Sequence, residues 1–357
     1  MKKKVRILIN AVRAFLSACR NIPLHRIIDY LQLYRSGLIS PEEYLNFQMW
    51  KKSPQFRDSF LSYNLAMEYW SILNPTHNAC LARDKYLTSI LLDKTQIPHP
   101  KLYAYYNPEM SNYNDSIANN IKELSSILTL SKKKSFVIKP SADSAHGNGV
   151  LVCNDFNSEL LTFKKYNGAL IKLSDIIHDK RAYLFEEPVI QNVQMMKLNS
   201  SSVNTVRIMT ALYPNQEVRL FAAWFKIGRA GSCIDNAGSG GNVDGGVNIN
   251  TGELFNATKF DSWSHLKSVD SHPDSKAKIN GLVLDNWSEI KRLVMDFQAR
   301  IPELKTIGWD VALTEHGPMI IEINNWWDPT GQLFIGKGWK KEVQDCYNAW
   351  KDYYNKR

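Results

Sequence analysis

The chain has 357 residues, of which 44% are hydrophobic and 22% are charged, a composition typical of water-soluble globular proteins. It contains no run of about 18 consecutive apolar residues, so no transmembrane helix is predicted. Its 18 glycines and 14 prolines are too few for a collagen-like or low-complexity protein. The five scattered cysteines form no C-x-x-C pair, which indicates reduced thiols and a cytoplasmic location rather than a disulfide scaffold or a zinc site.

The net charge of +9 is concentrated at the N-terminus, because residues 1–20 contain six Lys or Arg residues and no Asp or Glu. A nucleic-acid-binding protein usually spreads its basic residues over a folded face, so no nucleic-acid partner is predicted. Apolar residues recur at three- and four-residue spacing, which predicts a basic amphipathic helix over 1–20. Such a helix can lie on an anionic membrane surface at its periphery, or it can dock on the protein with its basic face in solvent.

Residues 21–78 are interpreted as an N-terminal helical region that is rich in aromatic residues. Within it, Ser40-Pro41-Glu42-Glu43 is a helix start, with Ser as N-cap, Pro at the first position and Glu at the third. The aromatic residues are interpreted as core, with sugar stacking as the alternative. Asn74-Pro75 predicts a break before the next domain.

The rest of the chain alternates helices and strands without the strict order of a doubly wound sheet, which predicts an α+β fold. Helices are predicted over 83–92, 115–130 and 283–301. Strands are predicted over 102–106, 135–139, 150–153, 182–186, 204–213, 217–227, 246–250, 306–313 and 318–323.

The last two strands flank a short Glu-His-Gly turn and are predicted to form a β-hairpin. If the loop centres on His316, position 314 lies opposite 318, position 312 opposite 320, and position 310 opposite 322. Asp310 and Glu322 then face each other with their Cβ atoms about 5 Å apart. Asn324 lies two residues beyond Glu322 and points to the same side of the sheet.

Two facing carboxylates on an apolar sheet repel each other unless one is protonated or a cation lies between them. The strands are too apolar for a solvent-facing edge, where the two acids would be harmless. Carboxylate and amide oxygens are hard ligands that suit Mg²⁺, or Mn²⁺, with phosphate oxygens and water completing the shell. The hairpin therefore predicts a metal site at Asp310, Glu322 and Asn324.

The sequence contains no G-x-x-x-x-G-K-[ST] loop, and its glycine cluster at 238–246 lies between two strands with no helix behind it. Instead, a strand ending in Lys139 precedes the small-residue loop 141–149, which is longer than a hairpin needs. Backbone N–H groups of such a loop can cover phosphates, with Lys139 as a point charge beneath them. A flexible surface hairpin is the alternative interpretation.

Two further segments suit a nucleotide. The strand before Glu186-Glu187-Pro188-Val189 meets a proline, so the chain leaves the sheet and frees backbone groups that can pair with an adenine edge. An ordinary edge strand explains this pattern equally well. Arg207 lies among apolar neighbours and, if it points inward, requires an anion such as a transferring phosphoryl group.

Taken in order, these segments resemble the ATP-grasp superfamily. Arg83-Asp84-Lys85-Tyr86 with Gln96-Ile97-Pro98-His99-Pro100 is similar to the opening segment of D-alanyl-D-alanine ligases, and the hairpin to their metal motif. The sugar-transfer-associated branch, related to the α-L-glutamate ligases, is indicated by residues 202–207, by Gly228-Arg229 through Asp235-Asn236, and by the glycine pairs 240–241 and 245–246. The resemblance covers roughly residues 75–357.

The resemblance implies two α+β lobes, 79–188 and 189–357, that grip ATP behind an N-terminal helical extension. It implies that ATP contacts come from Lys85, Lys139, Ser141, Asp143, Ser144, His146, Gly147, Asn148, Gly149, Glu186, Glu187 and Val189. In this superfamily, Glu186-Glu187-Pro188-Val189 would be the hinge segment that holds adenine. An acidic residue that often holds the ribose is expected shortly after this hinge, but residues 191–194 read Gln-Asn-Val-Gln. The ribose contact is therefore unassigned.

In this superfamily a carboxylate attacks the γ-phosphate of ATP, and an amine then displaces phosphate from the acyl phosphate to give an amide. Arg207 with Lys226 or Arg229 would stabilise the transferring group, and Asp235, Asn236, Gly240 and Gly241 would contact substrate. The branch implies amide formation between an amino acid and a uronic-acid carboxylate in bacterial capsule or surface-polysaccharide synthesis. The alternatives are a sugar kinase of the same fold and a non-catalytic nucleotide-binding component of a polysaccharide assembly complex.

Overall fold

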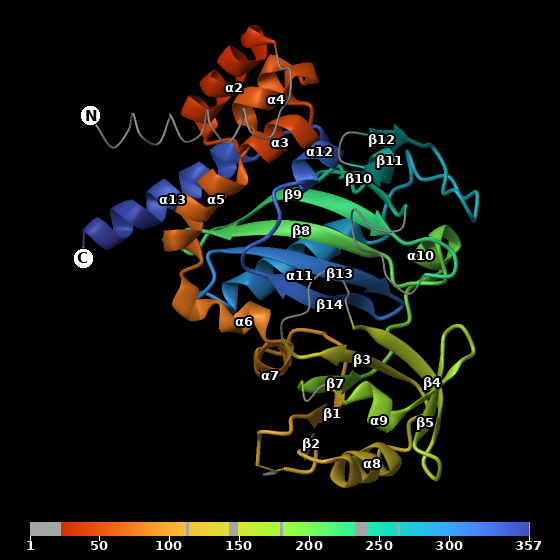
Figure 1. The fold of residues 1–357 in the computed structure, drawn as a ribbon. Helices are drawn as coiled ribbons and strands as arrows, with labels where there is room; N and C mark the ends of the chain where they lie inside the picture. Colours follow the sequence, from red (N-terminus) through yellow and green to blue (C-terminus); the bar gives the residue numbers. More distant parts are fainter. Residues whose placement is uncertain are drawn as a thin grey trace.

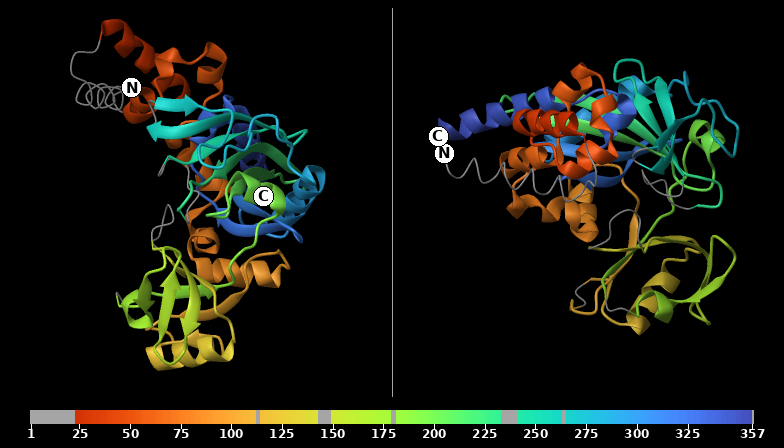
Figure 2. Two further views of the ribbon diagram at one scale, coloured as in Figure 1. Left: turned by 90° about the vertical axis from the view of Figure 1, so that its right-hand side faces the viewer. Right: turned by 45° about the horizontal axis from the view of Figure 1, so that its top comes forward.

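The computed structural model describes residues 23–111, 114–142, 149–178, 181–232, 241–262 and 265–356, so the basic helix expected over 1–20 lies outside the described residues. The described residues form two seven-stranded sheets with helices around them, which is the expected α+β class (Figure 1). The two views of Figure 2 show the first sheet in a lobe of its own beside the larger lobe that holds the second sheet. No described helix has the length and apolarity needed to cross a bilayer.

The N-terminal helices pack on the second lobe. They are α2 (Leu24–Gly37), α3 (Pro41–Asn46), the 3₁₀ turn η1 (Met49–Lys51), α4 (Pro54–Ser59) and α5 (Tyr63–Leu73). Ser40 caps α3 as expected, because its hydroxyl accepts from the Glu43 N–H while the Glu43 carboxylate accepts from the Ser40 N–H. Tyr30 and Tyr44 are fully buried in this region, and Trp70 of α5 packs against Trp327 of the second lobe.

The first sheet follows the order β2-β1-β7-β3-β4-β5-β6. Its strands are β1 (Leu102–Tyr106), β2 (Ile117–Ala118), β3 (Phe136–Pro140), β4 (Leu151–Asn157), β5 (Thr162–Lys165), β6 (Leu170–Lys172) and β7 (Tyr183–Glu186). The helices before and within this lobe are η2 (Thr76–Asn78), α6 (Cys80–Arg83), α7 (Lys85–Lys94), α8 (Ile121–Leu130) and α9 (Leu173–Ile176). Helix α8 begins later than the expected 115 because Asn120 caps it, accepting from the Glu123 N–H.

The second sheet follows the order β12-β11-β10-β9-β8-β13-β14. Its strands are β8 (Thr205–Leu212), β9 (Val218–Ile227), β10 (Val243–Val247), β11 (Leu254–Ser262), β12 (His265–Ser268), β13 (Thr306–Thr314) and β14 (Gly317–Asn324). The helices of this lobe are α10 (Val193–Leu198), α11 (Trp287–Ala299), α12 (Gly331–Ile335) and α13 (Lys340–Asn355).

The two faces of the second sheet differ because successive side chains of a strand point to opposite sides. On one face, apolar residues such as Ile208 and Trp309 form a core with α11. The other face carries Arg207 and Asp310, and its apolar part, including Trp224, packs under α5, α12 and α13. The rest of this second face holds the charged residues described below.

The β13–β14 hairpin brings Asp310 opposite Glu322, as expected, but by a different register. The turn is one residue tighter than assumed, so Thr314 pairs with Gly317 and Ala312 with Met319; the expected 314–318 and 312–320 pairs are wrong. A β-bulge then leaves Ile321 without a partner on β13, and this extra residue restores the 310–322 pair.

Two other expectations require correction. The strand predicted over 246–250 is β10, Val243–Val247, because Asn248 begins a turn in which its carbonyl accepts from the Gly252 N–H. Helix α13 was not predicted, although it buries Val343, Cys346 and Trp350 on one side.

Candidate functional site

Three nearly buried charged side chains meet on the second face of the second sheet. Arg207 lies opposite Asp310 across β8 and β13, and Lys226 extends from β9. The Asp310 carboxylate accepts from Arg207 Nε at 2.5 Å and from its NH2 nitrogen at 2.8 Å, and Lys226 Nζ lies 3.0 Å from Oδ1. All three side chains are at most 12% exposed. The geometry is a bidentate ion pair with a second cation on the same carboxylate.

The cations keep this buried carboxylate ionised. Burial by itself would raise the pKa of Asp310, but the charges and hydrogen bonds of Arg207 and Lys226 hold that pKa at about 2. Burial also opposes the charged form of Arg207, yet the Asp310 carboxylate raises the pKa of Arg207 above its usual value. The cation that two facing acids require is thus supplied in part by the protein itself.

Glu322 and Asn324 lie beside this cluster on β14 and are more open. The Glu322 side chain is 39% exposed, and its Oε1 lies 3.9 Å from Nζ of Lys85 on α7. Asn324 donates to the Gly308 carbonyl through Nδ2 at 3.2 Å. Burial and the neighbouring Lys139 lower the pKa of Lys85, although Glu322 opposes this shift. Lys85 therefore lies where an additional anion would stabilise its charged form.

A second lysine approaches from the first lobe. Lys139 on β3 pairs with Glu186 on the adjacent strand β7 at 2.7 Å, and both side chains are nearly buried. A small pocket joins these residues to Lys85 and Glu322, with walls from α7, from the first sheet and from β14. Helix α7 and strands of both lobes thus place two lysines and two glutamates around one pocket.

The first residue of the 141–149 loop is fastened to α7. The Ser141 hydroxyl donates to Asp84 at 2.9 Å, and the Ser141 carbonyl accepts from the Lys85 N–H at 2.8 Å. At the other end, Gly149 has φ +81°, and a Cβ there would lie 2.9 Å from Pro140 Cγ, so only glycine fits without strain. The intervening candidates Asp143, Ser144, His146, Gly147 and Asn148 lie outside the described residues.

After β7 the chain leaves the first sheet, as expected for the segment Glu186–Val189. The Glu187 N–H donates to the Lys101 carbonyl, and Val189 is partly buried. The polar side chains that follow hold structure: Gln191 bonds to Asn199, Ser202 and Asn204, Asn192 caps α10, and Gln194 bonds to the backbone at 283 and 285. These hydrogen bonds tie the three side chains to the protein, and the ribose contact stays unassigned.

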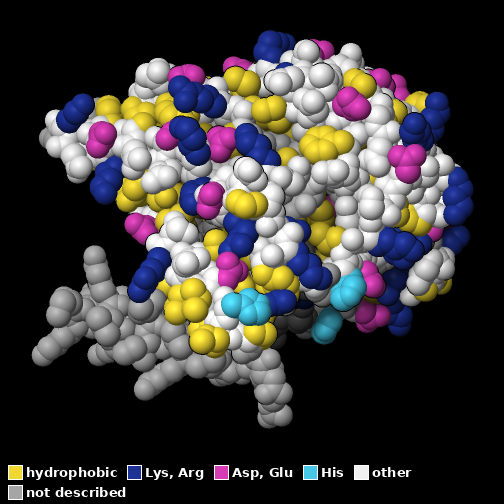
Figure 3. All heavy atoms as spheres, turned by 90° about the horizontal axis from the view of Figure 1, so that it is seen from above, with side chains coloured by type: hydrophobic (Ala, Val, Ile, Leu, Met, Phe, Trp, Pro, Cys, Tyr) yellow, Lys and Arg dark blue, Asp and Glu magenta, His cyan; other side chains and the backbone are white. Residues whose placement is uncertain are grey.

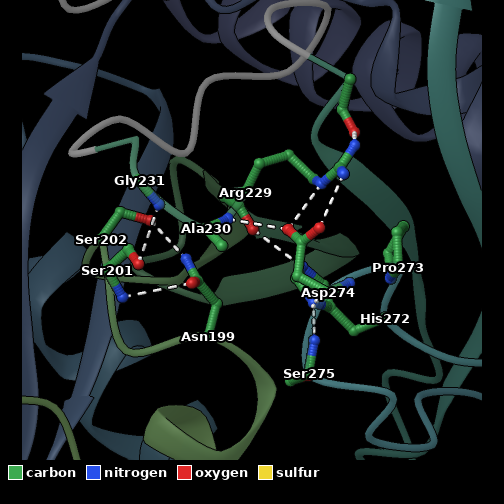
Figure 4. A network of polar contacts seen from close by, with 12 residues as sticks. Asn199, Ser201, Ser202, Arg229, Ala230, Gly231, His272, Pro273, Asp274 and Ser275 are labelled. Carbon is green, nitrogen blue, oxygen red and sulfur yellow. Dashed lines mark hydrogen bonds and ion pairs between the residues drawn. The ribbon is translucent and has the colours of Figure 1, made fainter.

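Arg229 makes a different set of contacts from Arg207 (Figure 4). Its guanidinium forms two 2.7 Å hydrogen bonds to Asp274 and a third, of 3.3 Å, to the Gly241 carbonyl. Asp274 also accepts from the Ala230 N–H, and these bonds lower its pKa. No described contact joins Arg229 to Arg207, Lys226 or Asp310, so of the two expected partners of Arg207 only Lys226 lies in its cluster. Asp235, Asn236 and Gly240 lie outside the described residues, and Gly241 takes φ +73°.

One buried acid was missed. Asp244 is fully buried on β10 and lies opposite Lys226, on the same face of the sheet. An acid within the apolar stretch Val243-Asp244-Gly245-Gly246-Val247 was the available sequence signal. The two residues after Asp244 are glycines because there is no room for a side chain. A Cβ would lie 2.4 Å from Phe225 at Gly245 and 2.3 Å from Phe255 at Gly246.

The donor set fits a divalent metal that arrives with phosphate. No group of three or more His, Cys, Asp or Glu residues gathers as a metal site in the described part of the chain. Asp310, Glu322 and Asn324 supply hard oxygen ligands of the kind that Mg²⁺ prefers. The two carboxylates, however, already face the cations Arg207, Lys226 and Lys85. A bare ion would meet excess positive charge there, which the oxygens of a polyphosphate would offset.

Comparisons with known proteins identify the family of this chain. The model of a family described as "Sugar-transfer associated ATP-grasp" matches residues 64–348. No curated protein matches the chain. Among solved structures, the D-alanine–D-alanine ligase of Helicobacter pylori is 16% identical, with 80% of this chain and 67% of that one covered and a TM-score of 0.43. A D-cycloserine synthetase is 11% identical, with 87% and 82% covered and a TM-score of 0.43.

Proposed function

Because the chain belongs to the sugar-transfer-associated ATP-grasp family, we propose that it is an ATP-dependent carboxylate–amine ligase that works through an acyl phosphate. The observation that carries this proposal is the buried Arg207–Asp310–Lys226 cluster, set beside Glu322 and Asn324 and faced by Lys85 and Lys139. A triphosphate placed over Glu322 would meet cations from both lobes. This is the charge distribution that phosphoryl transfer requires.

The cluster keeps hydrogen-bond donors for a phosphoryl group. Asp310 uses Nε and one NH2 hydrogen of Arg207, and a guanidinium has five N–H donors in all. Lys226 gives one of its three donors to Asp310. The remaining donors of both residues would bind the transferring phosphoryl group and the oxyanion of the acyl phosphate. Asp310 holds both cations in place before substrate arrives, so little reorganisation is needed.

Asp310, Glu322 and Asn324 would hold a magnesium ion, which would supply positive charge to offset that of the phosphates. Lys85 and Lys139 would hold the triphosphate, and the loop 141–149, anchored at Ser141, would exclude water from the acyl phosphate. No side chain of this chain has to act as a nucleophile, because the substrate carboxylate attacks ATP and the substrate amine completes the reaction.

The finer proposal is that an amino acid is joined to the carboxylate of a uronic acid during bacterial capsule or surface-polysaccharide synthesis, in the cytoplasm at the inner membrane face. The family description supports a sugar-linked process. A second support is Trp326, two residues after Asn324, which is partly exposed with the Arg83 guanidinium 5.1 Å from its ring. An indole face and an exposed guanidinium suit an acidic sugar, whereas Trp224 and Trp327 are core.

The test uses purified protein with ATP and Mg²⁺, screened against amino acids paired with uronic-acid glycans. We expect ADP and inorganic phosphate in equal amounts, with a new amide detected by mass spectrometry, only when both substrates are present. Phosphate retained on the sugar would identify a kinase instead. ADP release that needs no second substrate would contradict the ligase assignment.

A further inference from the structure

The N-terminal helical region contains a cavity of about 420 Å³ that shares no lining residue with the pocket at Lys85 and Glu322. It lies among α2, α3, η1 and α4, and Arg26, Asp29, Gln32, Tyr44, Trp50 and Arg57 form most of its wall. Figure 3 looks down onto the end of the molecule that carries these helices, where basic and acidic side chains lie among apolar ones. The volume is in the usual range for small-molecule sites, roughly 300 to 1,000 Å³.

The Asp29 carboxylate in this cavity already has hydrogen-bond and ion-pair partners. The Asp29 carboxylate accepts from the Tyr44 hydroxyl at 2.7 Å through Oδ2 and forms an ion pair with Arg57 through Oδ1. Burial, together with the hydrogen bond to Asp29, raises the pKa of Tyr44, so this phenol remains a donor to the carboxylate at ordinary pH. Asp29 and Arg57 therefore cancel each other's charge.

Arg26 is the cation that remains. Its guanidinium lies 4.0 Å from the centroid of the Trp50 ring, and it forms no ion pair with any residue that the structure describes. Trp50 also contacts the fully buried Tyr44, with a distance of 5.3 Å between the ring centroids. Stacking on a fixed indole orients the guanidinium and leaves its N–H edge for a planar anion.

The rest of the lining selects the kind of ligand. Most of the wall is charged or polar, and the exposed side chains of Gln32 and His25 add donors and acceptors, so a ligand rich in hydroxyl groups fits better than an apolar one. The uncompensated Arg26 adds a preference for a negative group. We propose that this cavity is a second ligand site that binds an anionic sugar, with its carboxylate or phosphate group on Arg26 and its hydroxyls on Gln32 and His25.

The site does not depend on the reaction proposed above, because it uses none of the residues assigned to nucleotide or metal. Full-length protein is titrated by calorimetry with glucuronate, glucose 1-phosphate and glucose, with and without ATP and Mg²⁺. We expect at least one of the two anionic sugars to bind at least tenfold more tightly than glucose. The sugar that binds more tightly shows whether the cavity prefers a carboxylate or a phosphate group. Arg26→Ala should weaken that binding at least tenfold, and Arg26→Lys should weaken it less.

Two controls make the result decisive. Arg35→Ala removes the same charge from the exposed last turn of α2, outside the cavity, and should leave binding unchanged. Gln32→Ala alters an exposed cavity residue without removing buried packing, and it should also weaken sugar binding. This variant therefore tests the site even if Arg26→Ala fails to fold. Binding that survives both cavity variants, equal binding of glucose, or no binding of either anionic sugar at millimolar concentration would overturn the proposal, whatever the outcome of the ligase assay.

Discussion

Arg207 and Asp310 lie directly opposite each other on the neighbouring strands β8 and β13, and two parallel hydrogen bonds join the guanidinium to the carboxylate. Lys226 adds a third contact to the same carboxylate. Because these groups are almost out of solvent, each holds the others charged and in place. A site that must stabilise a transferring phosphoryl group benefits from cations fixed in advance.

Asp310→Asn should abolish turnover while ATP binding partly survives. The change removes the proposed metal ligand and the carboxylate that orients Arg207 and Lys226, so we expect kcat to fall by roughly 100-fold or more. ATP affinity, measured by calorimetry, should fall less because Lys85 and Lys139 remain. Glu217→Gln in the exposed pair with Arg219 is the matched control and should have normal activity. An Asp310→Asn enzyme with full activity would refute the metal assignment.

Lys226→Ala and Arg229→Ala should have unequal effects. Lys226 contacts Asp310 within the cluster, whereas both terminal nitrogens of Arg229 and its Nε are engaged by Asp274 and Gly241. We expect kcat to fall by roughly 100-fold for Lys226→Ala and by less than about tenfold for Arg229→Ala. Steady-state kinetics of both variants decide the matter, and the reverse order would make Arg229 the phosphoryl-binding cation.

Lys85→Met should weaken ATP binding with little effect on folding. Burial lowers the pKa of this lysine, and a triphosphate would restore a favourable partner for its charge. Loss of one charge-assisted contact corresponds to roughly a tenfold or greater rise in the ATP dissociation constant. Lys94→Met, at the exposed end of the same helix, should bind ATP normally. Equal affinities for the two variants would remove Lys85 from the nucleotide site.

Divalent metal should bind weakly without nucleotide. Three cations surround the two carboxylates, so phosphate oxygens are needed to offset their charge. Electron paramagnetic resonance of Mn²⁺ should show at least tenfold tighter binding in the presence of ADP, and Glu322→Gln should reduce this gain. Tight stoichiometric Mn²⁺ binding to the protein alone would contradict the expectation.

The contribution of Asp310 to stability should disappear in acid. Its pKa is about 2 in the folded chain and roughly 3.9 when unfolded, so the stabilisation is complete above about pH 5 and lost as the pH falls towards 2. The difference in unfolding free energy between the natural protein and Asp310→Asn should therefore shrink by about 2 kcal/mol between pH 7 and pH 2.5. Urea titrations of both proteins at pH 7 and pH 2.5 measure this difference. If the difference is the same at the two pH values, Asp310 is not held ionised by its neighbours.

Local patterns predicted most of the strands and the facing acids, because alternating apolar residues and a turn define a hairpin. They did not predict how the pair forms, since both the tight turn and the bulge at Ile321 depend on backbone geometry that the residue types do not specify. Helix α13 was missed although its buried face is regular, because Trp, Tyr, Asn and Asp have modest helix propensity and packing on α5 stabilises it.

Pairings between distant segments were the least predictable part of the candidate site. Nothing near Arg229 in the sequence indicates Asp274 as its partner, and nothing near Lys139 indicates Glu186. Such contacts depend on how strands are ordered in a sheet. The sequence therefore identified the charged residues but not which of them neutralise one another.

The unpaired Ile321 makes the site sensitive to chain length as well as to residue identity. With the same tight turn and no bulge, Asp310 would lie opposite Ile321, and both Glu322 and Asn324 would turn to the apolar face that packs on α11. Flattening this bulge would thus dismantle the ligand set while keeping every acidic residue, whereas deleting Ile321 together with the bulge would keep Asp310 opposite Glu322. In any relative, the spacing between the two acids is therefore informative only together with the presence or absence of this bulge.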